Sequence, residues 1–191
     1  MKKIALFASG SGTNVENIIR YFEGNTDVRI ALVLSNNSEA CVHERARRLG
    51  VPSVTHPNAE FRESTHVLHT LAGYEIDFIA LAGFMYLLPP AIIDAYQNRI
   101  VNIHPSLLPK YGGKGMYGHH VHEAVVAANE KQSGITIHYV DNHYDEGDIV
   151  FQARCEVLPT DTPADVERKI HQLEYLHYPH VIESILKEKG G

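Results

Sequence analysis

The sequence predicts an α/β fold, in which a doubly wound, mostly parallel sheet is followed by an antiparallel hairpin and a closing helix. Two observations lead to this prediction. Short runs rich in apolar and β-branched residues alternate with segments of helical spacing through most of the length. Several of these runs are apolar on both faces, as strands buried inside a parallel sheet are. The alternation therefore favours parallel strands joined by right-handed helical crossovers.

The alternating elements fill the first half of the chain. The apolar runs have the length of strands, and the segments between them repeat their apolar residues with helical spacing. The predicted strands are 3–9, 28–36, 52–56, 77–85 and 99–104, and the predicted helices between them are 14–23, 41–49, about 61–73 and 89–97.

The last third of the chain changes pattern. A helix with the sequence HHVHEAVVAANE precedes two strands, over 134–141 and 148–157. Their short link, NHYDEG, indicates that the two strands pair as a hairpin. A closing helix is predicted to follow, with Thr162 as its N-cap, Pro163 in its first turn and Asp165 completing a capping box.

Length, composition and charge limit the class of protein. A chain of 191 residues, 44% hydrophobic and 21% charged, fits one globular domain, which we expect to span 1–191. The formal net charge of −6, without a long basic run, argues against nucleic acid as a partner. A membrane partner is not expected either, because no apolar stretch approaches about 20 residues and the first residues lead into a strand. Two cysteines, Cys41 and Cys155, are too few for a disulfide framework. We expect a cytoplasmic protein that acts on small molecules, as a monomer or weak homodimer.

The loop ASGSGTN follows the first predicted strand and opens the first helix. Gly10 and Gly12 allow the backbone to pass close to a ligand, and the free N–H groups of a helix start attract an anion. An ordinary turn, with Thr13 or Asn14 as the helix cap, fits the same residues. Val15 stands where a dinucleotide fingerprint has its third glycine, and the loop has no Gly-Lys-Ser/Thr. If the loop binds a ligand, a single phosphate monoester fits it best.

The fifth predicted strand ends in Asn-x-His-Pro. Strand alternation places Asn102 and His104 on one face, and Pro105 ends the ladder because it has no N–H. Ligands of open α/β sheets bind beyond the carboxyl ends of the strands. We therefore expect this pair to share a rim with Gly12–Asn14 and with the apolar segment Met85–Leu88. Turn residues and a buried strand end would give the same patterns.

The hairpin link supplies several carboxylates in the stretch DNHYDEGD. A polar turn explains them, but a carboxylate brought against His104 would raise the pKa of the imidazole and fix its orientation. Asn102 would then donate to an oxyanion formed beside the imidazole. This group of residues suits acyl-type transfer through a tetrahedral intermediate, because no serine or cysteine nucleophile is evident.

A histidine-rich stretch raises the alternative of a metal site, formed by His119, His120, His122 and Glu123. Neighbouring residues at a helix start point in different directions, and no second set of ligands is evident. We therefore expect no metal.

Five motifs make the prediction more specific. The segments SGSGTN, LAGFM, NIHPSLLP, DEGD and QLEYLHYP occur in this order along the chain. In order and approximate spacing, the chain resembles the phosphoribosylglycinamide formyltransferase family, which has a Rossmann-like formyltransferase fold, from Lys3 to about Leu186. NIHPSLLP is shared with other folate-dependent formyltransferases. The resemblance implies transfer of the formyl group of 10-formyltetrahydrofolate, a co-substrate, to the amine of 5-phosphoribosylglycinamide in purine biosynthesis.

The same resemblance implies roles for individual residues. It implies a catalytic trio that stabilises the oxyanion and moves a proton through a water molecule: Asn102, His104 and Asp145. It implies contacts to the phosphate and ribose of the ribonucleotide from Gly12, Thr13, Asn14 and Glu174. It implies a folate site made of Arg62, Met85, Tyr86, Leu87, Leu88, Asn102, Asp141 and Asp145.

Two features depart from the family pattern. Tyr86 stands where an arginine is common, and the loop over 110–120 is longer than usual. Three other functions compete with the main prediction. Methionyl-tRNA formyltransferases resemble the chain around HPSLLP but usually carry a C-terminal domain and a basic surface. Deformylating hydrolases usually carry an N-terminal regulatory domain, and a Rossmann-type nucleotide-binding module would lack the catalytic trio.

Overall fold

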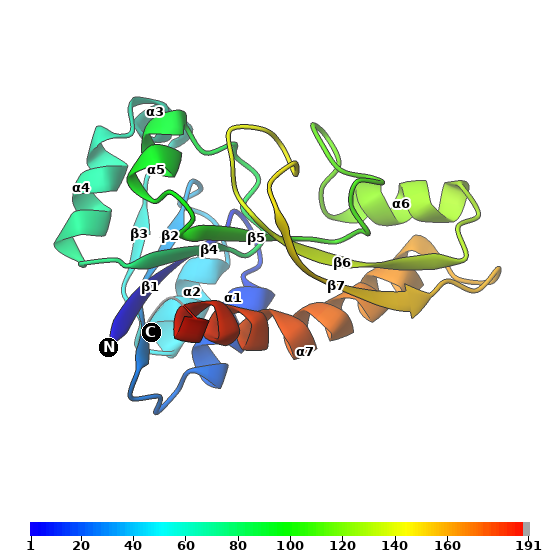
Figure 1. The fold of residues 1–191 in the computed structure, drawn as a ribbon, viewed down its shortest axis with the longest axis horizontal. Coiled ribbons are helices and arrows are strands. Elements are labelled where there is room, and N and C mark those ends of the chain that lie inside the picture. Colours follow the sequence, from blue (N-terminus) through cyan, green and yellow to red (C-terminus); the bar gives the residue numbers. More distant parts are fainter. Residues whose placement is uncertain (189–191) are drawn as a thin grey trace. The chain divides into compact units, whose positions relative to one another are not determined.

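The structure is a computed structural model that describes residues 1–188. By its internal contacts the chain forms two compact units, Met1–Val101 and the part from Asn102 onward. Figure 1 shows the elements of both units in chain order. The boundary between the units falls within β5 (Ile100–His104), and the predicted site residues are divided between the two.

Four parallel strands form the sheet of the first unit. In space they follow the order β3-β2-β1-β4, and every neighbouring pair among them is parallel. Reversal of the strand order beside β1 creates a switch point between β1 and β4, because the helical connections that follow these two strands run to opposite faces of the sheet. The bounds are β1 Lys2–Phe7, β2 Val28–Ser35, β3 Ser53–Thr55 and β4 Phe78–Leu81.

The strands of this unit are apolar on both faces because both faces are covered. Ile4, Leu6 and Phe7 of β1 are fully buried, and so are Leu32 and Leu34 of β2. Burial of each such side chain contributes about 1.5–3 kcal/mol relative to exposure. Runs without polar alternation therefore form central parallel strands, as predicted.

Helices cover the two faces of these strands. The chain runs through α1 (Thr13–Tyr21) and α2 (Val42–Arg48) toward the β3 edge. It then returns through α3 (Asn58–Glu63) and α4 (Thr65–Gly73) to β4, and α5 (Pro90–Ala95) follows. Right-handed crossovers place α1 and α2 on one face and α4 on the other, as in Figure 1.

The single helix predicted over about 61–73 is wrong, because two helices occupy this region. Ser64 has a φ of 64°, which interrupts the helical backbone. Its hydroxyl donates to the Phe61 carbonyl at 3.0 Å and so replaces a bond of the continuing helix. Serine competes with helical hydrogen bonding in this way, and periodicity alone does not reveal the break.

The second unit contains the end of β5 (Ile100–His104), the helix α6 (His119–Ala127) and a hairpin. Its strands β6 (Gln132–Tyr139) and β7 (Ile149–Glu156) pair in antiparallel register, as predicted. The closing helix α7 (Pro163–Glu188) packs against α6 and both hairpin strands.

The capping box of α7 is confirmed. The backbone N–H of Asp165 donates to Thr162 Oγ1 at 3.2 Å, and the N–H of Thr162 donates to Asp165 Oδ2 at 2.9 Å. The predicted α/β class, with parallel strands, a C-terminal antiparallel hairpin and a closing helix, is therefore confirmed as well.

Candidate active site

The end of β5 brings two predicted residues into one cluster of side chains. Asn102 Nδ2 lies 3.2 Å from His138 Nε2, and His104 Nδ1 lies 3.5 Å from Asp145 Oδ2. Asp145 Oδ1 in turn lies 3.5 Å from His138 Nε2. The His104 side chain is 5% exposed and that of Asp145 is 13% exposed, so solvent weakens these interactions little. Asn102, His104 and Asp145 thus lie together, joined through His138.

Asp145 is held in place by its own backbone conformation and by the long loop after β5. Its φ of 57° is tolerated by aspartate better than by most residues. Asp145 Oδ2 accepts a hydrogen bond from the Gly113 N–H at 2.9 Å. The same loop places the Tyr111 carbonyl 2.7 Å from His104 Nε2, which donates to it. The loop over 110–120 therefore takes part in the cluster, which the sequence did not reveal.

His138 is the residue of this cluster that sequence reasoning missed. Its Nδ1–H donates to the Tyr139 carbonyl at 2.8 Å. In the neutral ring this leaves Nε2 as an acceptor for the Asn102 amide, which fixes the orientation of that amide. Asn102 then has a second N–H to offer a ligand. The available signal was alternation along β6, which buries His138 on the same face as Thr136.

The turn that follows β5 is braced by the hairpin. Thr136 Oγ1 donates to the Ser106 carbonyl at 2.7 Å and accepts from the Leu108 N–H at 3.0 Å. Gln152 Nε2 donates to the Leu108 carbonyl at 3.1 Å. Three buried or half-buried contacts thus hold the HPSLLP segment, and with it the position of His104.

Burial and charge act in opposite directions on His104. Burial is the largest influence and lowers the pKa of the imidazole, whereas the Asp145 charge and the bond to Tyr111 raise that pKa. The net pKa lies below the ordinary value for histidine. The expectation that a carboxylate would leave the pKa of this imidazole raised is therefore wrong, because burial outweighs Asp145.

The pKa of Asp145 lies below its ordinary value although burial favours the protonated acid. Contact with His138, whose Nε2 lies 3.5 Å from Asp145 Oδ1, the charge of His104 and the Gly113 N–H together outweigh that burial. Asp145 is therefore ionised at neutral pH, and it supplies the negative charge that His104 faces.

Glu174 lies in the same unit, on α7, and is 5% exposed. Its Oε2 lies 2.7 Å from His171 Nδ1, and this hydrogen bond raises the pKa of His171. The negative charge of Glu174 also raises the pKa of His104. A buried carboxylate near the cluster suits recognition of ribose hydroxyls, which are hydrogen-bond donors.

In the first unit, the loop after β1 turns sharply at Gly12, which is the N-cap of α1 with a φ of 73°. Thr13 and Asn14 are therefore the first helical residues, and neither is the N-cap. A Cβ atom at Gly12 would lie 2.4 Å from Val42 Cγ2, so only glycine fits this turn. Backbone N–H groups at a helix start have no acceptor within the helix, which gives the loop the chemistry of an anion site.

The loops after β1 and β4 meet at the switch point of the first unit. The Ser9 N–H donates to the Gly83 carbonyl at 2.9 Å, and the Met85 N–H donates to Ser9 Oγ at 2.9 Å. The loop that leads to Gly12 thus contacts the segment that begins at Met85, at the carboxyl ends of β1 and β4. Met85 is 54% exposed and Leu88 is buried.

The remaining predicted folate residues are less closely grouped. Arg62 is exposed on α3, beside Phe61, whose ring centroid lies 5.9 Å from that of Tyr86. Asp141 is half-exposed and accepts from the His143 N–H at 2.8 Å, an interaction separate from those of Asp145. The structure therefore joins Asp145 to His104 and leaves Asp141 outside that cluster.

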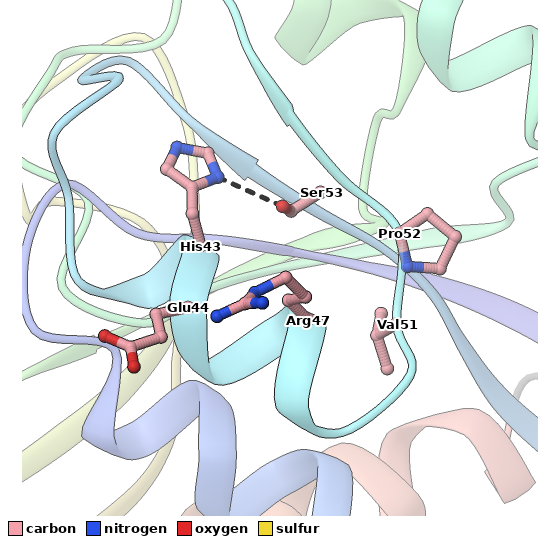
Figure 2. A pocket seen from close by; sticks show the side chains of 6 residues that line it. All are labelled: His43, Glu44, Arg47, Val51, Pro52 and Ser53. Atoms are coloured by element: carbon pink, nitrogen blue, oxygen red, sulfur yellow. Dashed lines mark hydrogen bonds between the residues drawn. The ribbon is translucent and has the colours of Figure 1, made fainter.

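A pocket of about 490 Å³ lies elsewhere in the first unit, beside α2 and β3 (Figure 2). The residues around it are His43, Glu44, Arg47, Val51, Pro52 and Ser53. His43 Nδ1 lies 3.1 Å from Ser53 Oγ. Asn102, His104 and Asp145 do not line this pocket. Over residues 1–188 no group of three or more His, Cys, Asp or Glu side chains could hold a metal ion.

These features define a class of protein. The first unit is a parallel α/β unit with a glycine turn at a helix start, and the second holds a buried Asn-His-Asp cluster without a serine or cysteine nucleophile. These two features together are typical of enzymes that transfer a small acyl group. The profile of the family described as Formyl transferase matches residues 2–182, and the chain belongs to that family.

Individual relatives agree with this assignment. The chain is 38% identical to "Phosphoribosylglycinamide formyltransferase, chloroplastic" of Vigna unguiculata, over 98% of this chain and 62% of the relative. It is 38% identical to phosphoribosylglycinamide formyltransferase of Bacillus subtilis, over 97% of this chain and 95% of the relative. The crystal structure of phosphoribosylglycinamide formyltransferase from Streptococcus pneumoniae aligns with a TM-score of 0.86 and 38% identity, covering 97% of this chain and 99% of that one. The chain thus spans less than two thirds of the plant relative and nearly all of the two bacterial ones.

Proposed function

We propose that this chain transfers the formyl group of 10-formyltetrahydrofolate to the amine of 5-phosphoribosylglycinamide. The single observation that carries the proposal is the contact of His104 with Asp145, at 3.5 Å, in a buried cluster that also contains Asn102. The names of the relatives give the substrate that this cluster would serve.

The cluster has the groups that the reaction requires. The amine attacks the formyl carbon, and the formyl oxygen becomes an oxyanion. The second N–H of Asn102 is directed by His138 and donates to that oxygen. The protonated ring of His104 adds positive charge beside the oxyanion. Its Nε2–H bonds to the Tyr111 carbonyl, so the oxyanion has to share this donor with that carbonyl.

Proton transfer completes the reaction. The attacking amine loses one proton, and N10 of the folate gains one as its bond to the formyl carbon breaks, so the products are the formamide and tetrahydrofolate. Asp145 is ionised and adjoins His104, so it supports the charged ring and can hold a water molecule that relays this proton. Binding both substrates in the right orientation supplies much of the rate.

Substrate recognition is assigned by matching chemistry to the remaining residues. The helix start at Gly12, Thr13 and Asn14 would bind the ribonucleotide phosphate, and Glu174 would accept from the ribose hydroxyls. The exposed side chain of Met85 and the adjoining segment would contact the folate ring, together with Tyr86, Leu87, Leu88, Arg62 and Asp141.

We further propose that both units act as one domain over 1–191, since the family profile extends through both of them. Within residues 1–188, each helix is too short or too polar for a membrane span. We propose that the enzyme acts on small molecules as a monomer or weak homodimer. We also propose that it is cytoplasmic, although the Vigna unguiculata relative is described as chloroplastic.

One assay separates this function from its competitors. Release of tetrahydrofolate from 10-formyltetrahydrofolate should require 5-phosphoribosylglycinamide. Release without any acceptor would indicate a hydrolase, and release that requires methionyl-tRNA would indicate the tRNA enzyme. No release with any acceptor would leave the nucleotide-binding module as the better interpretation.

The Gly12→Val variant tests the phosphate loop. A Cβ at this position would lie 2.4 Å from Val42 Cγ2 and 2.8 Å from its Cα, and valine is strained at a φ of 73°. We expect a loss of stability of about 2–5 kcal/mol from strain and overpacking. In the fraction that folds, the KM for the ribonucleotide should rise far more than the KM for the folate. Equal increases in both would mean that the loop does not bind the ribonucleotide.

A further inference from the structure

The loop over Gly10–Gly12 is held against α2 by backbone contacts. The Val42 N–H donates to the Gly10 carbonyl at 3.1 Å. A trans peptide directs its C=O and N–H to opposite sides. The bond at the Gly10 carbonyl therefore turns the Ser11 N–H away from α2. The absence of a side chain at Gly12 allows this close approach.

Arg45, on α2, fixes the next peptide of the same loop. Its Nε donates to the Ser11 carbonyl at 2.7 Å. By the same reasoning this bond turns the Gly12 N–H away from α2. The guanidinium also contacts Glu16 through Nη1, and the Glu16 N–H donates to the Gly12 carbonyl at 2.9 Å. One planar side chain thus joins the loop to the first turn of α1.

The same contacts control the charge beside the loop. Glu16 lies in the first turn of α1, where a free carboxylate would repel a phosphate. The largest influence on the pKa of Glu16 is the hydrogen bond from Arg20. Together with the hydrogen bond from Arg45 and the charge of Arg48, it lowers that pKa to about 2. Three guanidinium groups therefore surround one carboxylate, and the balance of charge beside the loop is positive.

We propose that Arg45 is a positioning residue for the ribonucleotide phosphate: it orients the Gly12 N–H through the Ser11 carbonyl and neutralises Glu16. It acts through the loop and does not itself touch the substrate. This inference rests on the proposed function, in that the loop is taken as the phosphate site.

Helix α2 offers two matched controls. Arg48 is one turn beyond Arg45 and donates to Glu16 at 2.7 Å, so it shares the charge role without reaching Ser11. Arg47 faces the pocket beside β3, as Figure 2 shows, on another side of α2. The Arg45→Lys variant keeps the positive charge, but it lacks the planar guanidinium that donates to Ser11 and Glu16 at the same time.

The decisive measurement is equilibrium binding by calorimetry, without folate, of 5-phosphoribosylglycinamide and of the same molecule without its phosphate. Arg45→Ala should weaken binding of the phosphorylated ligand about tenfold or more, as expected for losing a charge-assisted hydrogen bond. Binding of the phosphate-free ligand should change by less than about twofold. Arg45→Lys should resemble Arg45→Ala, and Arg47→Ala should resemble the wild type. Arg48→Ala should fall between them.

Each other outcome overturns the inference. If Arg45→Ala weakens the binding of both ligands equally, or lowers only the melting temperature, Arg45 has a general structural role. If Arg45→Lys binds like the wild type, charge and not orientation accounts for the effect. If the wild type does not distinguish the two ligands, the loop is not a phosphate site. Should Arg45→Ala fail to fold, Arg45→Lys and Arg45→Gln carry the same comparison. Failure of the proposed function is detected separately, as the absence of formyl transfer by the wild type.

Discussion

Replacing His104 with alanine is expected to lower kcat at least about 10²-fold while changing the KM for 10-formyltetrahydrofolate little. In the proposed mechanism, the variant loses the positive ring beside the oxyanion, and Asp145 loses its partner. Because the charge develops only in the transition state, the loss falls on kcat. The rate of tetrahydrofolate release under saturating substrates measures it.

Controls separate chemistry from folding in this variant. Removal of the ring leaves the Tyr111 carbonyl without its donor, which costs about 1–3 kcal/mol. Unfolding in denaturant should therefore be measured beside turnover. His143→Ala is a matched control, because that side chain is 70% exposed on the hairpin link. Added imidazole should restore part of the rate. Turnover near that of the wild type in the folded variant would disprove the catalytic role.

The fold was predictable where local sequence and tertiary environment agree. The strands of the first unit are apolar on both faces, and this pattern has few structural solutions other than a covered parallel sheet. The capping box joins Thr162 to Asp165, only three residues away, so the local sequence is enough to predict it. The break at Ser64 was missed, because a serine fits a helix surface as well as a helix end.

The site was predictable only in part, for a related reason. Alternation along β5 paired Asn102 with His104, and the resemblance chose Asp145 among the hairpin carboxylates. His138 was missed, because alternation along β6 predicts its burial but does not distinguish a site residue from the other histidines among thirteen. Its role depends on the register of the hairpin, which brings it within 3.5 Å of Asp145. The contacts from Tyr111 and Gly113 depend on the path of a loop that sequence patterns do not fix.

The direction of the His104 pKa shows the same limit. Sequence reasoning named the carboxylate that raises this pKa, but it had no measure of burial. Burial proves to be the larger influence and acts in the opposite direction. The lowered pKa changes how the chemistry depends on pH, because the charged ring is scarcer at neutral pH than a raised pKa would make it.

Asp145→Asn is expected to move the high-pH limb of the pH–rate profile to lower pH and to reduce turnover at pH 7 about tenfold or more. Among the groups that raise the pKa of His104 against burial, Asp145 has the largest effect, so its neutralisation lowers that pKa further. The protonated ring is present below its pKa and is lost as the pH rises through it. The charged catalyst therefore disappears at lower pH in the variant. Turnover measured from about pH 5 to pH 9 reveals the shift.

The fold should survive this substitution, which makes the result interpretable. Asparagine tolerates the φ of 57° at this position, and its carbonyl oxygen can still accept from the Gly113 N–H. Glu146→Gln and Asp148→Asn are matched controls on the exposed part of the link and should keep the wild-type profile. Asp141 lies outside the His104 cluster and contacts His143 instead. If Asp141→Asn abolished turnover while Asp145→Asn kept the wild-type profile, the carboxylate that supports His104 would be Asp141. The hairpin link would then have to close differently during catalysis.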